Sequence, residues 1–223
     1  MPDPAVSPFR PEHFARQDER GDAEFYVPER MVQHLDDAGR AALTGFYSDH
    51  LPAGGRVLDL MSSWVSHLPD DIAFATVAGL GMNRAELAAN PRLTEHHVHD
   101  LNADPRLPFD DGAFEACLIA LSVQYLTRPL EVFAEIARVL APGGLCVVSF
   151  SNRCFPTKAV AIWCALDDGG HAGLVGAYFR HAGGFDEPVG LDISPSGVAG
   201  DPLFVVTARR DNDIRHEDGT ETT

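Results

Sequence analysis

The sequence predicts an α/β fold in which a doubly wound, mostly parallel, seven-stranded sheet ends in an antiparallel hairpin. Short, continuously apolar runs are typical of buried parallel strands, and helical segments alternate with them along the chain. Such alternation implies right-handed crossovers and helices on both faces of a sheet. Two later strand-like runs, joined by a turn-rich segment, predict the hairpin. A length of 223 residues gives room for one domain with short tails.

The two ends of the chain differ in character from its middle. Residues 1–22 and 211–223 are polar and charged without apolar periodicity, so both are expected to be mobile tails. The domain between them spans residues 23–210. It opens with a helical cap, residues 23–55, in which residues 29–51 carry apolar side chains at helical spacing until a proline and two glycines close the segment.

Strands and helices follow in turn. The expected parallel strands are residues 56–61, 72–78, 96–101, 115–121 and 145–150. The expected helices between them are residues 84–89 and 129–140, and a Pro-Gly-Gly sequence stops the second one. After a helical stretch over residues 156–181, the hairpin strands are expected at residues 188–193 and 203–208.

Composition excludes several classes of partner. A formal net charge of -16 and a pI near 4.8 would repel a nucleic-acid backbone and anionic lipid, and no apolar run reaches the roughly 20 residues of a membrane span. The four cysteines lack the spacing of a metal knuckle or disulfide scaffold, and no signal peptide is evident, so a cytoplasmic protein with reduced thiols is expected. No metal site is expected either, because no carboxylate or thiol at ligand spacing completes the set begun by His96, His97 and His99.

Ligands of an open doubly wound sheet bind beyond the carboxyl ends of its strands, so the loops there form the candidate site. A dinucleotide-binding protein would carry G-x-G-x-x-G after the first strand, where this chain has Met-Ser-Ser-Trp-Val-Ser-His at residues 61–67. A Gly-Leu-Gly sequence follows the second strand instead, but Arg84 stands where the third glycine would be. A nicotinamide cofactor is therefore disfavoured, and no phosphate-binding P-loop is present.

Two later motifs carry a resemblance to a known family. Leu-Pro-Phe-Asp-Asp-Gly-Ala-Phe-Glu-Ala at residues 107–116 and Glu-Ile-Ala-Arg-Val-Leu-Ala-Pro-Gly-Gly at residues 135–144 resemble motifs of the class I S-adenosylmethionine-dependent methyltransferases, in the methyltransferase-11-like branch. Val-Leu-Asp-Leu at residues 57–60 resembles the start of that family's first motif. The resemblance covers roughly residues 30–210 and implies a Rossmann-like fold and S-adenosyl-L-methionine as cofactor.

The resemblance also assigns the cofactor residues, with two departures. The family's glycine-rich turn is replaced by a glycine-free loop, in which hydroxyls and backbone amides would make the contacts. Gly81 stands where the family usually has an acidic residue for the ribose, and Asn83 would be a weaker substitute. Trp64, in a loop expected to enter a helix, and His67 either line the cofactor mouth or pack. The implied cofactor residues are Asp59, Met61, Ser62, Ser63, Trp64, His67, Gly81, Met82, Asn83, Asp100, Leu101 and Ser122.

Polar and aromatic residues after the fourth and fifth strands are expected to meet a small-molecule substrate. Arg153 or Lys158 would hold an acidic group while Phe155 packs on it, although capping and solvation explain the same residues. Tyr125 or His34 would accept a proton where the nucleophile needs it. Cys154 is interpreted as structural. The expected substrate residues are Gln124, Tyr125, Asn152, Arg153, Phe155 and Lys158.

The function predicted from these residues is in-line transfer of a methyl group to an O, N or S nucleophile of a small molecule. The alternative is a non-catalytic module of the methyltransferase fold whose cofactor loop has degenerated, and a third possibility is group transfer from a modified form of the same sulfonium cofactor. The intact Asp59 and Asp100 favour the enzyme. The sequence assigns neither the acceptor nor the oligomeric state.

Overall fold

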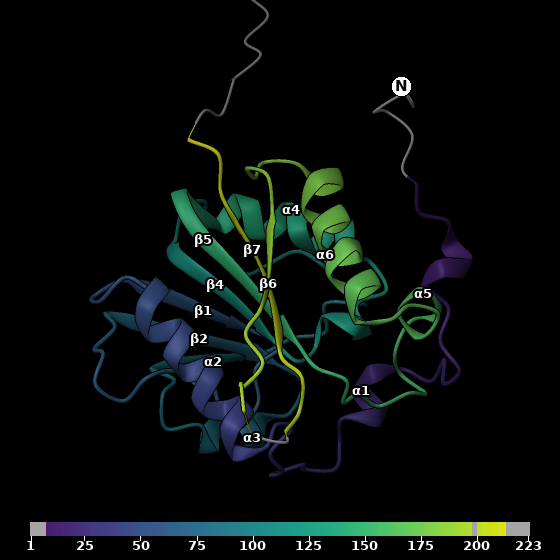
Figure 1. Ribbon diagram of the computed structural model, residues 1–223, viewed down its shortest axis with the longest axis horizontal. Coiled ribbons are helices and arrows are strands. Elements are labelled where there is room, and N and C mark those ends of the chain that lie inside the picture. The colour runs from purple at the N-terminus through teal and green to yellow at the C-terminus, as the bar shows by residue number, and fades with distance from the viewer. Residues whose placement is uncertain (1–7, 198–199, 213–223) are drawn as a thin grey trace, which may run out of the picture.

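The computed structural model describes residues 8–197 and 200–212. Seven strands form one sheet in the order β3-β2-β1-β4-β5-β7-β6 (Figure 1). The first five strands are parallel, and β7 runs antiparallel to both β5 and β6. The predicted doubly wound sheet with a terminal hairpin is therefore confirmed. The strands are β1 (Arg56–Leu60), β2 (Thr76–Gly81), β3 (Glu95–Val98), β4 (Phe114–Ala120), β5 (Leu140–Phe150), β6 (Val189–Asp192) and β7 (Phe204–Arg209).

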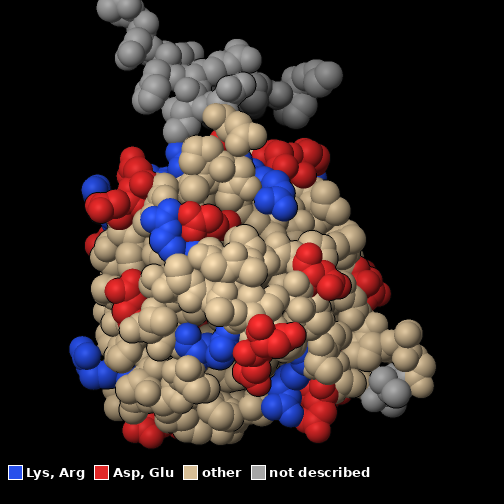
Figure 2. All heavy atoms as spheres, turned by 90° about the vertical axis from the view of Figure 1, so that its left-hand side faces the viewer, with Lys and Arg blue, Asp and Glu red and all other residues tan. Residues whose placement is uncertain are grey.

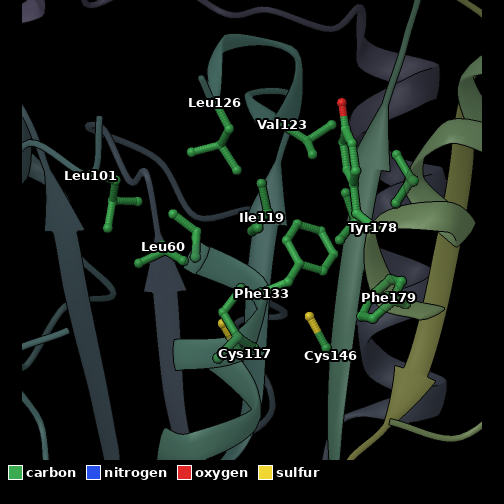
Figure 3. Close-up of a cluster of buried hydrophobic side chains, with 14 of the residues drawn as sticks. Leu60, Leu101, Cys117, Ile119, Val123, Leu126, Phe133, Cys146, Tyr178 and Phe179 are labelled. Carbon is green, nitrogen blue, oxygen red and sulfur yellow. The ribbon is translucent and has the colours of Figure 1, made fainter. Parts of the chain in front are cut away.

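Helices cover both faces of the sheet. Along β4, Ala116 and Leu118 pack in the cluster under α2, whereas Cys117 and Ile119 pack in the cluster under α4 and α6, as the two-residue period of a strand requires. Figure 3 shows Phe133 of α4 at the centre of the second cluster. The helices are η1 (Pro11–Phe14), α1 (Asp22–Phe25), α2 (Asp37–His50), α3 (Arg84–Ala89), η2 (Val123–Tyr125), α4 (Pro129–Val139), α5 (Ala161–Cys164) and α6 (Asp168–Ala182).

The crossover from β1 to β2 contains no helix. Residues 61–75 form an irregular loop, so the expectation that Trp64 leads into a helix is wrong. Side chains from neighbouring elements satisfy carbonyl groups of this loop. Thr44 of α2 donates to the oxygen of His67 at 2.9 Å, and Arg92 donates to the oxygens of Pro69 and Ile72, both at 2.9 Å. These bonds replace part of what a helix would have supplied internally.

Two elements begin later in the chain than predicted. β2 starts at Thr76 and continues through Gly79 and Gly81, whose lack of a side chain hid the strand's end in the sequence pattern. α2 starts at Asp37, eight residues after the predicted start at residue 29. The Asp36 carboxylate caps the helix there by accepting from the Gly39 amide at 2.7 Å. The segment before Asp36 is thereby free to run across the end of the sheet.

Two other boundaries also differ from the sequence expectation. The predicted helical stretch over residues 156–181 divides into α5 and α6, because Asp167 caps α6 by accepting from Gly170 at 2.8 Å. β5 starts at Leu140 rather than at Leu145, and its register with β4 shifts across the Pro-Gly-Gly sequence, where Gly143 has a φ of 73°.

The described part of the predicted N-terminal tail, residues 8–22, packs on the domain. The Asp18 amide donates to the oxygen of Thr157, and the Ala161 amide donates to the oxygen of Ala15, both at 2.8 Å. These bonds tie the segment to the chain after β5, a contact that local sequence periodicity does not report. The rest of the two predicted tails, residues 1–7 and 213–223, lies outside the described residues.

A buried ion cluster fastens this segment to the domain. Lys158, the single lysine of the sequence, is fully buried, and its Nζ donates to the oxygen of Arg20 at 2.6 Å and lies 3.1 Å from Asp22. The Asp22 carboxylate also accepts two bonds from Arg16, at 2.7 and 2.9 Å, and one from Asn102 at 2.7 Å. Such a charge group is stable when buried only because every member has partners.

Charges on the surface are mixed. Figure 2 shows one face of the molecule, on which acidic and basic side chains are interspersed among uncharged ones. Within residues 8–197 and 200–212, no helix combines the length and apolar character needed to cross a bilayer.

The Lys158→Met variant should lose about 3 kcal/mol of unfolding free energy, because removal of one member leaves the carboxylate of Asp22 buried with less compensation. Urea unfolding followed by circular dichroism measures the loss. The control is Arg180→Met, which removes the exposed ion pair with Glu187 and should cost less than about 1 kcal/mol. Equal losses in the two variants would contradict the structural role of the cluster.

Candidate functional site

A cavity of about 200 Å³ lies at the carboxyl ends of β1 to β5, where a doubly wound sheet is expected to bind its ligands. Loops after all five parallel strands line it, and residues of the N-terminal segment line it from the outside. Every residue predicted to contact a cofactor belongs to its lining. The lining residues that the sequence predicted are His34, Asp59, Met61, Ser62, Ser63, Trp64, His67, Gly81, Met82, Asn83, Asp100, Leu101, Ser122, Tyr125, Arg153 and Phe155.

Three residues predicted to bind substrate do not line the cavity. Gln124 is buried in η2, where its amide nitrogen donates to the oxygen of Leu121 at 2.9 Å. Asn152 is exposed next to the cavity-lining Arg153. Lys158 is enclosed in the ion cluster. The substrate contacts predicted for these three residues stay predictions, and none of the three belongs to the cavity lining.

Residues outside the predicted set also line the cavity. Glu86 stands three residues after Asn83, the spacing of a helix-capping pair, which is a signal for a helix start rather than for a site. Arg30 lies in a segment predicted to be helical. The additional lining residues are Asp22, Tyr26, Arg30, Val65, Leu80, Glu86, His99, Asn102, Ala120, Leu121, Leu126 and Cys154.

The loop after β1 is organised by a buried carboxylate. Asp59 Oδ2 accepts from the hydroxyls of Ser62 and Ser66, both at 2.6 Å. The amide nitrogen of Asn90, at the end of α3, donates to Ser66 Oγ at 2.8 Å and to the oxygen of Ser63 at 2.9 Å. Hydroxyls and an amide thus hold this glycine-free loop, which does not continue into the expected helix.

Backbone strain is concentrated around the cavity. Met61, His67 and Leu121 have φ values of 58°, 56° and 56°, and they are the non-glycine residues with positive φ among the described residues. All three line the cavity. Such conformations cost about 1–3 kcal/mol for a non-glycine residue, and they cluster at functional sites. Met61 therefore takes, at a cost, the left-handed conformation that a glycine would adopt easily.

Gly81 explains how a loop without glycine comes close to the sheet. The Ser62 amide donates to the oxygen of Leu80 at 2.8 Å, so the loop crosses the end of β2 in direct backbone contact. A Cβ atom at Gly81 would lie 2.1 Å from the oxygen of Ser62. The glycine needed for close approach stands on the strand that is crossed, and an acidic residue at this position would not fit.

Gly81→Ala should therefore lower the unfolding free energy by about 1–3 kcal/mol, because the backbone of the loop has to move away from the new methyl group. The control is Gly45→Ala in α2, where no atom lies within 4 Å of the added Cβ. That substitution should stabilise the protein by about 0.5–1 kcal/mol. Urea unfolding compares the two, and a stable Gly81→Ala protein would contradict the crossing.

Asn83 is occupied by structural bonds. Its Oδ1 caps α3 by accepting from the amides of Ala85 and Glu86 at 2.9 and 3.2 Å. Its Nδ2 donates to the oxygens of Tyr26 and Val27 at 3.0 and 3.2 Å. The predicted use of Asn83 as a substitute for an acidic ribose ligand therefore competes with two structural roles.

Two more side chains connect the cofactor loops to the N-terminal segment. Glu86 accepts from the backbone amide of Arg30 at 2.8 Å and from the hydroxyl of Ser63 at 2.6 Å. The indole nitrogen of Trp64 donates to the oxygen of Val32 at 3.0 Å. Residues 26–34, here called the strap, are thus held across the cavity by the same loops that line it.

The loop after β3 is closed by its own carboxylate. Asp100 Oδ1 accepts from the amides of Asn102 and Ala103 at 2.9 and 3.2 Å. Asn102 in turn bonds the chain after β4, since it donates to the oxygen of Tyr125 at 3.0 Å and accepts from the Thr127 amide at 2.8 Å. This fixes Asp100 and Leu101 at the edge of the cavity.

Burial shifts the titration of several lining residues. It raises the pKa of Tyr125 to about 12, and the Tyr125 hydroxyl accepts from the amide of Phe155 at 2.8 Å. Burial also lowers the pKa of His34, and it lowers the pKa of His67 to about 4. At neutral pH the phenol of Tyr125 and the imidazoles of His34 and His67 are therefore uncharged. Among the described residues, no three His, Cys, Asp or Glu side chains are placed to hold a metal ion.

The Asp59→Asn variant tests the buried carboxylate. Burial raises the pKa of Asp59 to about 6, above its value in an unfolded chain, so the folded protein holds this proton more tightly. The stabilisation is complete below about pH 4 and is lost as the pH rises through about 6. As the pH rises between these values, the unfolding free energy of the wild type should fall by about 2–3 kcal/mol more than that of Asp59→Asn, whose amide cannot ionise.

Urea unfolding at stepped pH measures this difference. Asp110→Asn, at an exposed aspartate outside the cavity lining, is the control and should follow the wild-type profile. If Asp59→Asn also follows that profile, Asp59 does not titrate as its burial requires.

Part of the chain is similar in sequence to known methyltransferases. A family model described as a methyltransferase domain matches residues 62–148. The malonyl-[acyl-carrier protein] O-methyltransferase of Marinomonas sp. (strain MWYL1) is 32% identical over 77 residues, which are 34% of this chain and 28% of that protein. The chain spans less than half the length of the curated relatives it matches.

Two solved structures share the fold. An S-adenosylmethionine-dependent methyltransferase from Aquifex aeolicus has a TM-score of 0.56 and 16% identity, over 78% of this chain and 94% of that chain. The [4+2]-cyclase SpnF also has a TM-score of 0.56 and 16% identity, over 83% of this chain and 90% of that chain. At such identities the likeness establishes the fold alone.

Proposed function

We propose that this chain, in which residues 62–148 match a methyltransferase-domain family model, is a class I S-adenosylmethionine-dependent methyltransferase that methylates an O, N or S nucleophile of a small molecule. One observation carries the proposal. Every residue to which the sequence resemblance gives a cofactor contact lines a single cavity at the carboxyl edge of the sheet, including Asp59 and Asp100. These residues come from β1 itself, from the end of β2 and from the loops after β1, β2, β3 and β4.

The residues present fit the cofactor in spite of the unusual loop. Met61 adopts the left-handed conformation of the glycine that it replaces, and Gly81 lets the loop lie against the sheet. The Asp59 carboxylate holds the loop by accepting a hydrogen bond from the hydroxyl of Ser62. The loop after β1 would hold the amino acid part of the cofactor, and the loop after β3, with Asp100, would hold the adenine.

When bound, S-adenosylmethionine supplies a methyl group on a sulfonium, ready for in-line displacement. The chain itself supplies alignment and exclusion of water, the main sources of rate for such a transfer. The strap excludes water, because hydrogen bonds to Glu86 and from Trp64 hold it across the cavity. The loops after β4 and β5 face the acceptor.

Of the two proton acceptors predicted from the sequence, His34 suits the role and Tyr125 does not. Burial raises the pKa of Tyr125 to about 12, so its phenol stays protonated at neutral pH. Its hydroxyl positions the loop after β5 through the amide of Phe155. Burial lowers the pKa of His34, so its imidazole is neutral and able to take a proton from the acceptor.

Calorimetric titration with S-adenosylhomocysteine tests the cofactor pocket without need of an acceptor. We expect binding by the wild type, and a loss of about tenfold or more in Asp100→Asn, which keeps the oxygen that closes the loop but not the charge. Asp110→Asn, outside the cavity, should bind like the wild type.

The absence of binding by the wild type would sink the methyltransferase proposal. It would favour instead a non-catalytic module of the same fold. The irregular loop that joins β1 to β2 in place of a helix is the observation in favour of that alternative. Binding would justify a search for the methyl acceptor among small molecules.

A further inference from the structure

Charge is divided between the two halves of the cavity. The half formed by the ends of β1, β2 and β3 and by the start of α3 contributes the carboxylates of Asp59, Glu86 and Asp100. The fourth carboxylate of the lining, that of Asp22, is paired with Arg16 and Lys158 in the ion cluster. Two guanidinium groups, those of Arg30 and Arg153, also line the cavity, and both lie on its other side, with the residues after β5. A cation therefore fits the first half and an anion fits the second.

The guanidinium of Arg153 is oriented by a hydrogen bond to Asp201. Its Nε donates to Asp201 Oδ1 at 2.8 Å, and Asp201 is itself fixed by reciprocal bonds with Asp36, at 2.9 and 3.1 Å. Within the described part of the chain, the Nη1 and Nη2 groups of Arg153 have no hydrogen-bond acceptor. The edge of the guanidinium that bears two parallel N–H groups, the edge that suits a carboxylate, is thus left for a ligand.

The guanidinium of Arg30 is fixed by aromatic rings and backbone oxygens rather than by a carboxylate. Its guanidinium carbon lies 4.5 Å from the ring centroid of Phe25 and 5.5 Å from that of Phe155. It donates to the oxygens of Phe25 and Pro28 at 2.8 and 3.1 Å. Its charge is therefore held beside the ring of Phe155, without a carboxylate partner on its guanidinium among the described residues.

Aromatic rings make up the wall between these charges. The ring of Phe155 stacks on Tyr125 with centroids 5.9 Å apart and an angle of 29°, and it meets His34 edge-on at 5.8 Å. Phe155 follows Arg153 by two residues in the same loop. A flat apolar body can pack on such a wall while a charged group at its edge reaches an arginine.

We propose that the acceptor half of the cavity binds a planar carboxylic acid, whose carboxylate pairs with Arg153 in the field of Arg30 while its ring packs on Phe155. The assignment of this half to the acceptor rests on the proposed function, but the binding of the acid does not. A cationic acceptor would face two guanidinium groups, and a neutral one would leave the free edge of Arg153 unused.

Benzoate and benzamide have the same shape and differ in charge, and neither needs to be methylated to bind. Ligand-observed NMR titrations of the whole protein, with and without S-adenosylhomocysteine, measure their dissociation constants. Benzoate should bind about tenfold or more tightly than benzamide, and benzylammonium should bind more weakly than either. The Arg153→Gln variant should abolish the preference for benzoate.

The chain offers a matched control for this variant. Arg180 also makes one Nε bond to a carboxylate, that of Glu187, at 2.8 Å, and its side chain is 49% exposed compared with 53% for Arg153. It lies outside the cavity lining. Arg180→Gln should therefore keep the full preference for benzoate, and the thermal midpoints of both variants should stay close to the wild-type value.

The outcomes separate this inference from the methyltransferase proposal. Equal binding of benzoate and benzamide, tighter binding of benzylammonium, no binding of any probe, or a preference that survives in Arg153→Gln would each overturn the acid site. If S-adenosylhomocysteine binds and the preference is absent, the acid site alone fails. If the preference is present and S-adenosylhomocysteine does not bind, the acid site stands and methyl transfer fails.

Discussion

The candidate site depends on the crossing of one strand by one loop. The chain leaving β1 passes over the end of β2, where the Ser62 amide bonds the oxygen of Leu80 and the Ser62 oxygen occupies the space of a side chain at Gly81. This contact fixes the direction of residues 61–67. It also excludes any side chain from Gly81, so the loop and the strand cannot vary independently.

The crossing has two consequences for the cavity. It brings the hydroxyl of Ser62 onto the buried carboxylate of Asp59, and the hydroxyl of Ser63 onto Glu86. Glu86 also accepts from the amide of Arg30, so the same chain of bonds that orders the cofactor loop continues into the strap. Polar side chains and backbone contacts thus replace the helix that usually stiffens a crossover between parallel strands.

The sequence predicted most of the fold, because buried parallel strands carry a strong local signal. It also predicted most of the cavity lining, since topology places the ends of parallel strands together. It did not predict contacts between distant segments. Arg30 and Lys158 have no local pattern that separates a cavity residue from a buried ion pair, and in the structure the former lines the cavity and the latter does not. The true end of β2 escaped for a similar reason, because Gly79 and Gly81 look like a turn until Leu93 and the loop are seen to fill their space.

The placement of arginine in the cavity has to be weighed against the charge of the whole chain, which is -16. That charge repels an anion at long range, so the acid site has to act at short range. Exposed charges are screened beyond about 8–10 Å at moderate ionic strength, whereas a carboxylate in contact with a guanidinium inside a cavity is screened far less. Selection of a planar acid therefore rests on the local geometry around Arg153, which Asp201 orients and Phe155 completes, while the acidic surface keeps anions from binding elsewhere.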